Sequence, residues 1–133
     1  MIQDTGTREM SPKAVEILKN IKETWNELQN APNGTLLPNG VSLPPSSGTY
    51  LHNVDNLEKQ VGSLSDETSN GFQTELRYLC HTVDKECAYV KHYRYDARKS
   101  KEKNHEALSG LMREANEQIA LDLLPILQLT HNI

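Results

Sequence analysis

The chain has 133 residues, of which 36% are hydrophobic and 24% are charged, and its net charge is −4. These values fit a single domain with a modest core, and an aromatic content of only 5% argues against an all-β fold. No apolar run approaches the roughly 18 residues of a membrane span, and the first residues lack a signal-peptide pattern, so we expect a cytosolic or nuclear protein.

The first predicted helix covers residues 12–30. Ser11 and Pro12 are typical of a helix start, because serine accepts a hydrogen bond from a first-turn amide and proline fits the first helical position. Apolar residues then recur from Ala14 to Leu28 at steps of three and four, which places them on one face of a helix.

Residues 31–48 are rich in proline and contain Pro-Asn-Gly twice, so they cannot be helical. We expect an extended connector whose leucines dock on the helices. The alternative is a small hairpin in which Leu36 and Leu37 pair with Val41 and Leu43. The same composition would also suit a short proline-rich ligand.

The spacing of apolar residues predicts a second helix over 49–65 and a third over 72–99. The polar residues 66–71 should separate them, although the second helix could instead continue into the third. We expect 72–99 to be the longest helix. The charged Arg94 interrupts its apolar stripe, which suggests that its C-terminal end projects beyond the body.

A fourth helix is predicted over 104–124, with Asn104 as its N-cap. Pro125 should terminate or kink this helix at Leu124, because proline cannot donate the next backbone hydrogen bond. The alternative is one unbroken helix over 72–124.

The predicted fold is therefore all-α. We expect an antiparallel bundle of three or four helices, with one long extended helix and coiled-coil-like packing at shallow angles. A flexible tail over residues 1–10 should precede a single helical domain over 11–133.

Sequence patterns for catalysis and metal binding are weak. Neither a Gly-x-Ser-x-Gly motif nor a Gly-rich phosphate loop occurs. Cys80, His81, Asp84 and Cys87 are metal-ligating residue types, but on a straight helix the two cysteines lie about two turns, roughly 10 Å, apart. That separation is too long for a disulfide or a shared zinc ion. We expect a non-enzymatic protein without metal, cofactor or small-molecule substrate.

The repeated apolar stripes suggest a function in association. Our hypothesis is a non-catalytic adaptor or complex subunit that pairs with a helical protein partner or with itself. The stripe residues that we expect to bind the partner are Leu18, Ile21, Trp25, Leu28, Leu76, Leu79, Val83 and Val90.

Charge is unevenly distributed along the chain. Residues 85–103 contain seven Lys or Arg against three acidic residues, whereas the remainder contains seven basic and fifteen acidic residues. This segment is either a solvated helix face or a binding site for an anionic partner, such as nucleic acid or an acidic membrane surface. The candidate residues for an anionic partner are Lys91, Arg94, Arg98, Lys99, Lys101 and Lys103.

Overall fold

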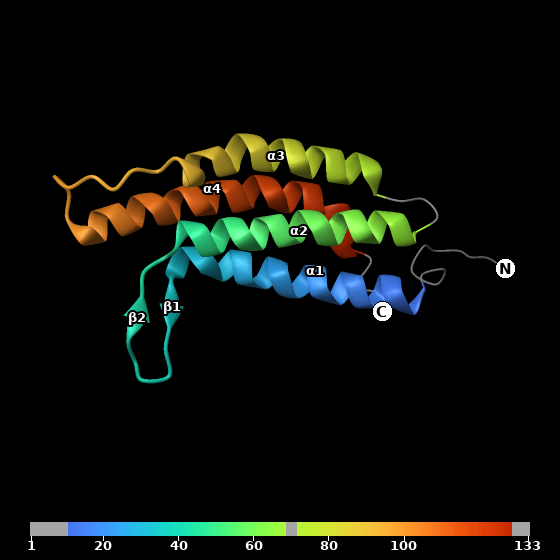
Figure 1. Ribbon diagram of the computed structural model, residues 1–133, viewed down its shortest axis with the longest axis horizontal. Helices are drawn as coiled ribbons and strands as arrows, with labels where there is room; N and C mark the ends of the chain where they lie inside the picture. Colours follow the sequence, from blue (N-terminus) through green and yellow to red (C-terminus); the bar gives the residue numbers. More distant parts are fainter. Residues whose placement is uncertain (1–10, 69–71, 129–133) are drawn as a thin grey trace.

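A computed structural model describes residues 11–68 and 72–128, and Figure 1 shows its elements. The predicted tail 1–10 lies outside the described residues. Four helices packed against each other account for most of this part of the chain. The prediction of an all-α fold built from packed helices is therefore confirmed at this level.

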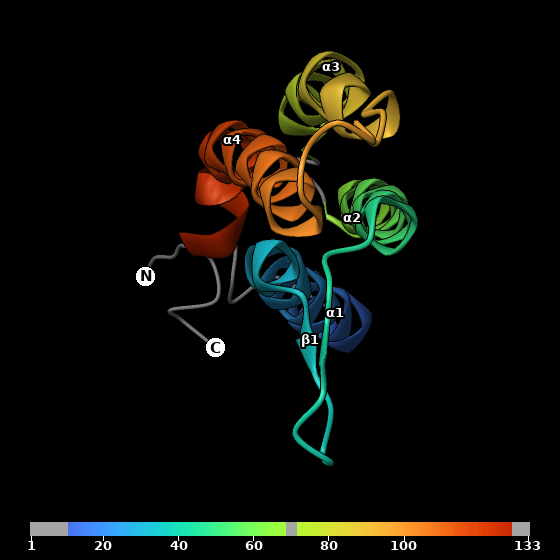
Figure 2. The same cartoon turned by 90° about the vertical axis from the view of Figure 1, so that its left-hand side faces the viewer.

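The helices are α1 (Pro12–Asn30), α2 (Ser47–Glu67), α3 (Gln73–Lys91) and α4 (Lys101–Leu127). Between α1 and α2 lie the 3₁₀ turn η2 (Ala31–Asn33) and the strands β1 (Thr35–Leu36) and β2 (Ser42–Leu43). Each helix packs on the next along the chain, and α4 also contacts α1 and η2. The end-on view in Figure 2 places α4 between α3 and α1, with α2 beside them.

Helix α1 has the bounds that the sequence predicts. The Ser11 hydroxyl oxygen accepts a hydrogen bond of 3.1 Å from the Ala14 amide, as expected for an N-cap. Helix α2 extends two residues beyond the predicted 49–65 at each end. Thr68 then leaves the helical conformation, with φ −114° and ψ 144°, so α2 does not continue past it as a helix.

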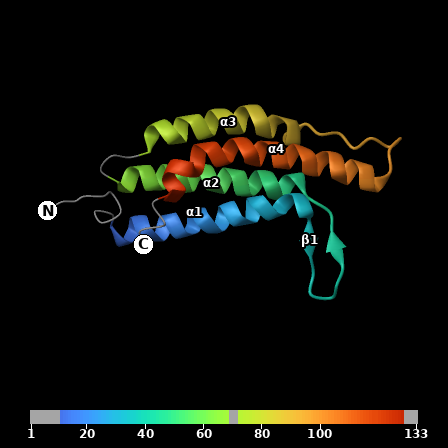
Figure 3. The same cartoon turned by 180° about the vertical axis from the view of Figure 1, so that it is seen from behind.

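The segment between α1 and α2 is a hairpin, and the prediction of docked leucines was wrong for Leu36 and Leu43. Leu36 is 73% exposed, and the hairpin stands away from the helices in Figures 1 and 3. Gly34 explains how the strands approach at the root, because it has φ 75° and a Cβ there would collide with the Leu43 carbonyl oxygen. Thr35 faces Leu43 in the antiparallel pair.

Helix α3 ends at Lys91, well before the predicted residue 99, and a loop over residues 92–100 follows. The predicted end at residue 99 is therefore wrong, and so is the alternative of one unbroken helix over 72–124. The Ser100 hydroxyl oxygen accepts a hydrogen bond of 3.1 Å from the Lys103 amide, so Ser100 is the N-cap of α4 and Asn104 is not. As a result α4 is the longest helix, with 27 residues against 19 for α3.

Pro125 does not end α4 at Leu124, because the helix continues to Leu127. The last part of α4 bends toward α1 in Figures 1 and 2, as a proline ring in a helix favours. Ile126 is only 1% exposed and anchors this last turn in the core. Burial of that side chain offsets the backbone hydrogen bond that proline cannot donate.

Polar side chains fix the position of α4 relative to its neighbours. The Tyr50 hydroxyl, on α2, donates a hydrogen bond of 2.6 Å to Oδ1 of Asn116. Nδ2 of Asn116 donates one of 2.8 Å to the carbonyl oxygen of Leu28, at the end of α1. The Ser109 hydroxyl donates one of 2.6 Å to the Pro32 carbonyl oxygen in η2. The Ser109 bond attaches the root of the hairpin to α4, and the Asn116 bonds link α4 to α1 and α2.

Candidate functional site

Most of the predicted partner-binding residues of the stripes fill the core of this chain. Leu18, Ile21, Leu28, Trp25, Leu79 and Val90 are at most 8% exposed, and Leu76 and Val83 are half-buried against the same core. Other helices of the chain already cover these side chains. A helical partner would therefore reach them only if the bundle opened.

The basic segment is placed differently. All six candidate residues for an anionic partner are exposed, at the end of α3, in the 92–100 loop and in the first turn of α4. We call this set the basic surface; its members are Lys91, Arg94, Arg98, Lys99, Lys101 and Lys103. The sequence prediction placed most of them on one helix, whereas the structure distributes them over a helix end, a loop and a helix start.

One member of the basic surface is partly neutralised. The Arg98 guanidinium contacts both carboxylate oxygens of Asp96, at 3.2 and 3.3 Å. Hydrogen bonds from the Arg98 side chain and amide hold the pKa of Asp96 below its usual range. Among the described residues, Arg98 is the only member of the set that forms an ion pair, so the charges of the other five are not compensated in this way.

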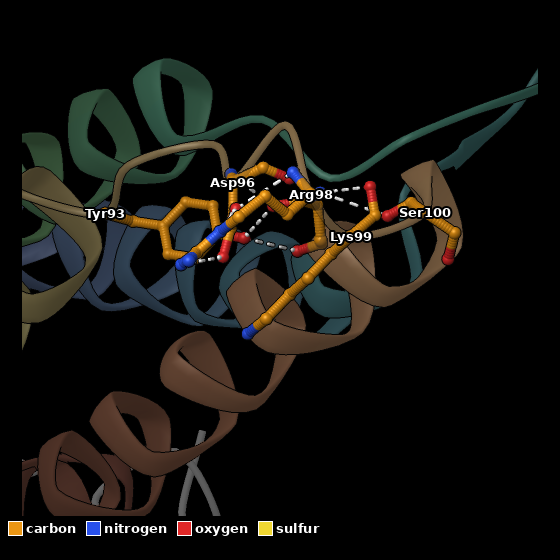
Figure 4. A network of polar contacts seen from close by, with 6 residues as sticks. Tyr93, Asp96, Arg98, Lys99 and Ser100 are labelled. Atoms are coloured by element: carbon orange, nitrogen blue, oxygen red, sulfur yellow. Dashed lines mark hydrogen bonds and ion pairs between the residues drawn. The ribbon is translucent and has the colours of Figure 1, made fainter.

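A buried asparagine, Asn104, holds the 92–100 loop in place, and Figure 4 labels its partners Tyr93, Asp96 and Ser100. Asn104 is 1% exposed, and its Oδ1 accepts hydrogen bonds from the Tyr93 hydroxyl, at 2.6 Å, and from the Asp96 amide, at 2.8 Å. Its Nδ2 donates to the carbonyl oxygens of Asp96 and Ser100, at 2.9 and 3.0 Å. One side chain thus pairs two donors and two acceptors. The sequence prediction missed this role, because these partners become neighbours only when the loop folds back.

The tyrosines of this region divide into two kinds. Tyr93 packs against the core and reaches Asn104, so its ring belongs to the support of the loop. Tyr95 is 60% exposed and Tyr89, on the outer face of α3, is 58% exposed. Of the two exposed rings, that of Tyr95 lines the same groove as Lys101.

An open groove of about 640 Å³ lies along the hairpin and the first half of α4. Pro44, Pro45, Lys101, His105 and Arg113 line it, together with the acidic residues Glu102 and Glu106. Tyr95 also lines it. Through Lys101 the groove adjoins the basic surface, and it reaches the hairpin at Ser42 and Leu43.

The hairpin exposes apolar side chains. Leu36, Val41 and Leu43 are 73%, 50% and 44% exposed. The sequence from residue 31 to residue 54 contains no Asp, Glu, Lys or Arg, although 24% of the whole chain is charged. Figures 1 and 3 place the hairpin and the 92–100 loop at the same end of the bundle. This end thus combines an uncharged apolar projection with a basic surface.

The thiols and their acidic neighbours form a separate cluster between α2 and α3. Burial raises the pKa of Cys87 to about 12 and that of Cys80 to about 11, so both thiols are protonated at neutral pH and are weak nucleophiles. Burial also raises the pKa of Glu58, whose side chain is hydrogen-bonded to Cys80. Within residues 11–68 and 72–128, no three His, Cys, Asp or Glu side chains are grouped so that they could hold a metal ion.

The chain matches no protein-family model, and no curated protein and no solved structure matches it either. In the described part of the chain, no helix combines the length and the apolar character needed to cross a bilayer. The function must therefore be argued from the surface of the molecule itself.

Proposed function

We propose that this chain is a non-catalytic helical module that binds an anionic partner through the basic surface. The observation that carries the proposal is the contrast between the two candidate sets. The stripe residues are mostly buried in the chain's own core, whereas all six basic candidates are exposed on a loop and two helix ends. Binding of this kind needs no catalytic group, metal or cofactor.

The support beneath the loop favours binding. Because Asn104 pairs with Asp96 and with Ser100, the backbone that carries Arg98 and Lys99 is held in one arrangement. A fixed loop loses little conformational entropy when it binds, so more of the electrostatic attraction contributes to affinity. The charge of residues 85–103 is opposite in sign to that of the rest of the chain, which would orient the molecule as it approaches an anionic surface.

The scaffold that we propose for this surface is an antiparallel bundle with coiled-coil-like packing. In Figure 1 the chain follows α1 to the end with the hairpin, returns along α2, and repeats this path with α3 and α4. Each helix packs on its predecessor, as such a path requires. The core residues of α1 recur at steps of three and four, which suits shallow helix crossings.

A second candidate function is the protein adaptor that the stripes suggest. One observation favours it: Leu121 and Leu124, on α4, are 66% and 52% exposed. Such side chains could pair with another helix without opening of the bundle. Light scattering of the pure chain tests self-association of this kind. A mass near 15.0 kDa would exclude it, and a multiple of that mass which Leu121→Ser and Leu124→Ser abolish would support it.

The proposed function is tested with heparin, a sulfated polymer that has neither bases nor a bilayer. The variant Lys99→Glu/Lys103→Glu reverses two charges of the basic surface. It should fold, because a glutamate three residues after the Ser100 N-cap completes a capping box. Lys19→Glu/Lys22→Glu, on two exposed residues of α1, is the control with the same net charge.

We expect the wild type and the α1 control to leave a heparin column at similar salt concentrations. The Lys99→Glu/Lys103→Glu variant should elute at clearly lower salt, because it has lost two of the contacts that displace counterions. Equal elution of the two variants would mean that only net charge matters, and it would contradict a site at the basic surface. Failure of the wild type to bind would contradict the proposal outright.

A further inference from the structure

We propose that the anionic partner is a membrane surface containing acidic phospholipids, contacted by the basic surface and the hairpin together. This inference rests on the proposed function and names its partner. The basic surface supplies attraction to the headgroups, and the hairpin places its apolar side chains among the upper acyl chains. Peripheral membrane proteins typically combine electrostatic attraction with apolar insertion, because either interaction alone binds the membrane too weakly.

The hairpin has the composition that an interfacial contact needs. Leu36 and Val41 are at least half exposed in water, and each would lose apolar surface to the lipid. No charged side chain between residues 31 and 54 opposes this transfer. The hairpin is therefore better suited to an apolar environment than to water.

Hydrogen bonds within the hairpin already satisfy backbone groups that would contact the lipid. At the turn, the Gly40 amide donates to the Leu37 carbonyl oxygen at 2.9 Å, and the Leu37 amide donates to the Val41 carbonyl oxygen at 2.8 Å. The Val41 amide donates to Oδ1 of Asn39 at 3.0 Å. Pro38 has no amide hydrogen to satisfy. Few donors at the turn thus lose hydrogen bonds to water when it enters the interface, where each unpaired group is costly.

The arrangement of the two parts permits simultaneous contact. The hairpin and the 92–100 loop are both outlying features of the same end of the bundle in Figures 1 and 3. The exposed Tyr95 lies in the groove between them, and tyrosine is common at the level of lipid headgroups. The hairpin projects across the bundle axis and the loop extends along it, so a plane inclined to that axis can meet both features.

A nucleic-acid partner would account for the basic surface but not for the exposed apolar residues of the hairpin. Lysines and arginines of the basic surface would bind phosphates equally well, but the hairpin would add neither a positive charge nor an aromatic ring for base stacking. Its exposed leucine and valine would have no partner on a phosphate backbone. The membrane accounts for both features, whereas nucleic acid accounts for one.

The test is cosedimentation of the full chain with vesicles, either of phosphatidylcholine alone or containing about one-third phosphatidylserine. The hairpin variant is Leu36→Thr/Val41→Thr, which places threonine, a β-branched residue suited to a strand, at both positions. The matched control is Leu121→Thr/Leu124→Thr, which removes apolar side chains of similar exposure from the far part of α4. The basic variant Lys99→Glu/Lys103→Glu completes the set.

We expect the wild type to bind the anionic vesicles and to bind the neutral vesicles much more weakly. The basic variant should bind the anionic vesicles about tenfold or more weakly at low salt, with a smaller difference at high salt, because salt screens exposed charges. The hairpin variant should bind about fivefold more weakly at both salt concentrations, because apolar transfer is not screened. The α4 control should bind like the wild type.

Three results would overturn the inference. Binding to anionic vesicles that the hairpin variant retains in full would remove the hairpin from the contact. Binding to single-stranded DNA and heparin but not to vesicles would refute the membrane while leaving the proposed function standing. Binding to none of these probes would refute both.

Discussion

The Tyr93 hydroxyl donates a hydrogen bond of 2.6 Å to Oδ1 of Asn104, which joins the residues that follow α3 to the first turn of α4. Asn104 is almost fully buried, and the same oxygen also accepts the Asp96 amide. The loop between the two helices is thus held from beneath while its basic side chains face solvent. These hydrogen bonds fix the loop backbone that carries part of the basic surface.

Replacing Asn104 with alanine should destabilise the protein more than any single change in the loop. The Asp96 amide would lose its partner, which costs about 1–3 kcal/mol, and the Tyr93 hydroxyl and the carbonyl oxygens of Asp96 and Ser100 would each lose one of their hydrogen bonds. We expect the free energy of unfolding in urea to fall by about 2–3 kcal/mol, since water can reach some of these groups. Tyr93→Phe, which removes the hydroxyl that contacts Oδ1 and the carbonyl oxygen of Asn104 and keeps the ring, should cost about 1 kcal/mol. Equal losses for the two variants would contradict the central role of Asn104.

Local signals in the sequence were sufficient to predict α1 and to locate α2. Ser11 and Pro12 start α1 by interactions within four residues, and its apolar spacing depends only on helical geometry. The end of α3 was not predictable in this way. Apolar residues and good helix formers continue past Lys91, and the chain leaves the helix because Asn104 offers partners to the folded loop.

The candidate site was predictable in part. Charge counting found the six basic residues and their asymmetry, because charged side chains at a surface are visible in composition alone. The hairpin was only the alternative prediction, since a two-stranded piece is marginal without support. Its support comes from the Ser109 hydroxyl, which binds the Pro32 carbonyl oxygen from a residue far along the chain. No pattern in the sequence indicates such a contact.

The ionised carboxylate of Glu58 should destabilise the folded protein near neutral pH. Burial, with repulsion from Asp84 and Asp55, raises the pKa of its carboxyl group above the ordinary value. Stability from this group is therefore full below its ordinary pKa of 4.5 and is lost as pH rises through the raised value. We expect Glu58→Gln to be more stable than the wild type at pH 7 by less than about 1 kcal/mol, because solvent screens this half-exposed group.

The advantage of Glu58→Gln should shrink as the pH approaches 4. Urea unfolding of both proteins between pH 4 and pH 8 measures it. Parallel pH profiles for the two proteins would contradict the assigned cause.

Cys87 should make the protein sensitive to alkali. Burial raises the pKa of this thiol from 9.0 to about 12, so the unfolded chain loses the proton first. Stability is then full below pH 9 and declines as pH rises toward 12, by at most about 1.4 kcal/mol for each pH unit. Cys87→Ala, although less stable overall, should show a smaller decline between pH 9 and pH 10. An unchanged decline would assign the alkaline sensitivity to other groups.

Replacement of Gly110 or Gly34 with alanine should change the stability of the protein in opposite directions. At Gly110, inside α4, an added Cβ meets no atom within 4 Å, so Gly110→Ala should stabilise the protein by about 0.5–1 kcal/mol. At Gly34 the positive φ and the Leu43 carbonyl oxygen oppose any side chain, so Gly34→Ala should destabilise the hairpin root. Thermal unfolding of the two variants measures both effects, and a stabilising Gly34→Ala would contradict the described turn.

The most direct test of the central claim is the salt dependence of binding to anionic vesicles, measured from about 50 to 200 mM salt for the wild type and for Lys99→Glu/Lys103→Glu. If the basic surface binds the partner, log K should fall steeply with log salt concentration for the wild type, and the slope should be shallower for the variant. The α1 control Lys19→Glu/Lys22→Glu should keep the wild-type slope. A slope that is the same in all three proteins, or that is near zero in the wild type, would contradict the assignment of binding to this surface.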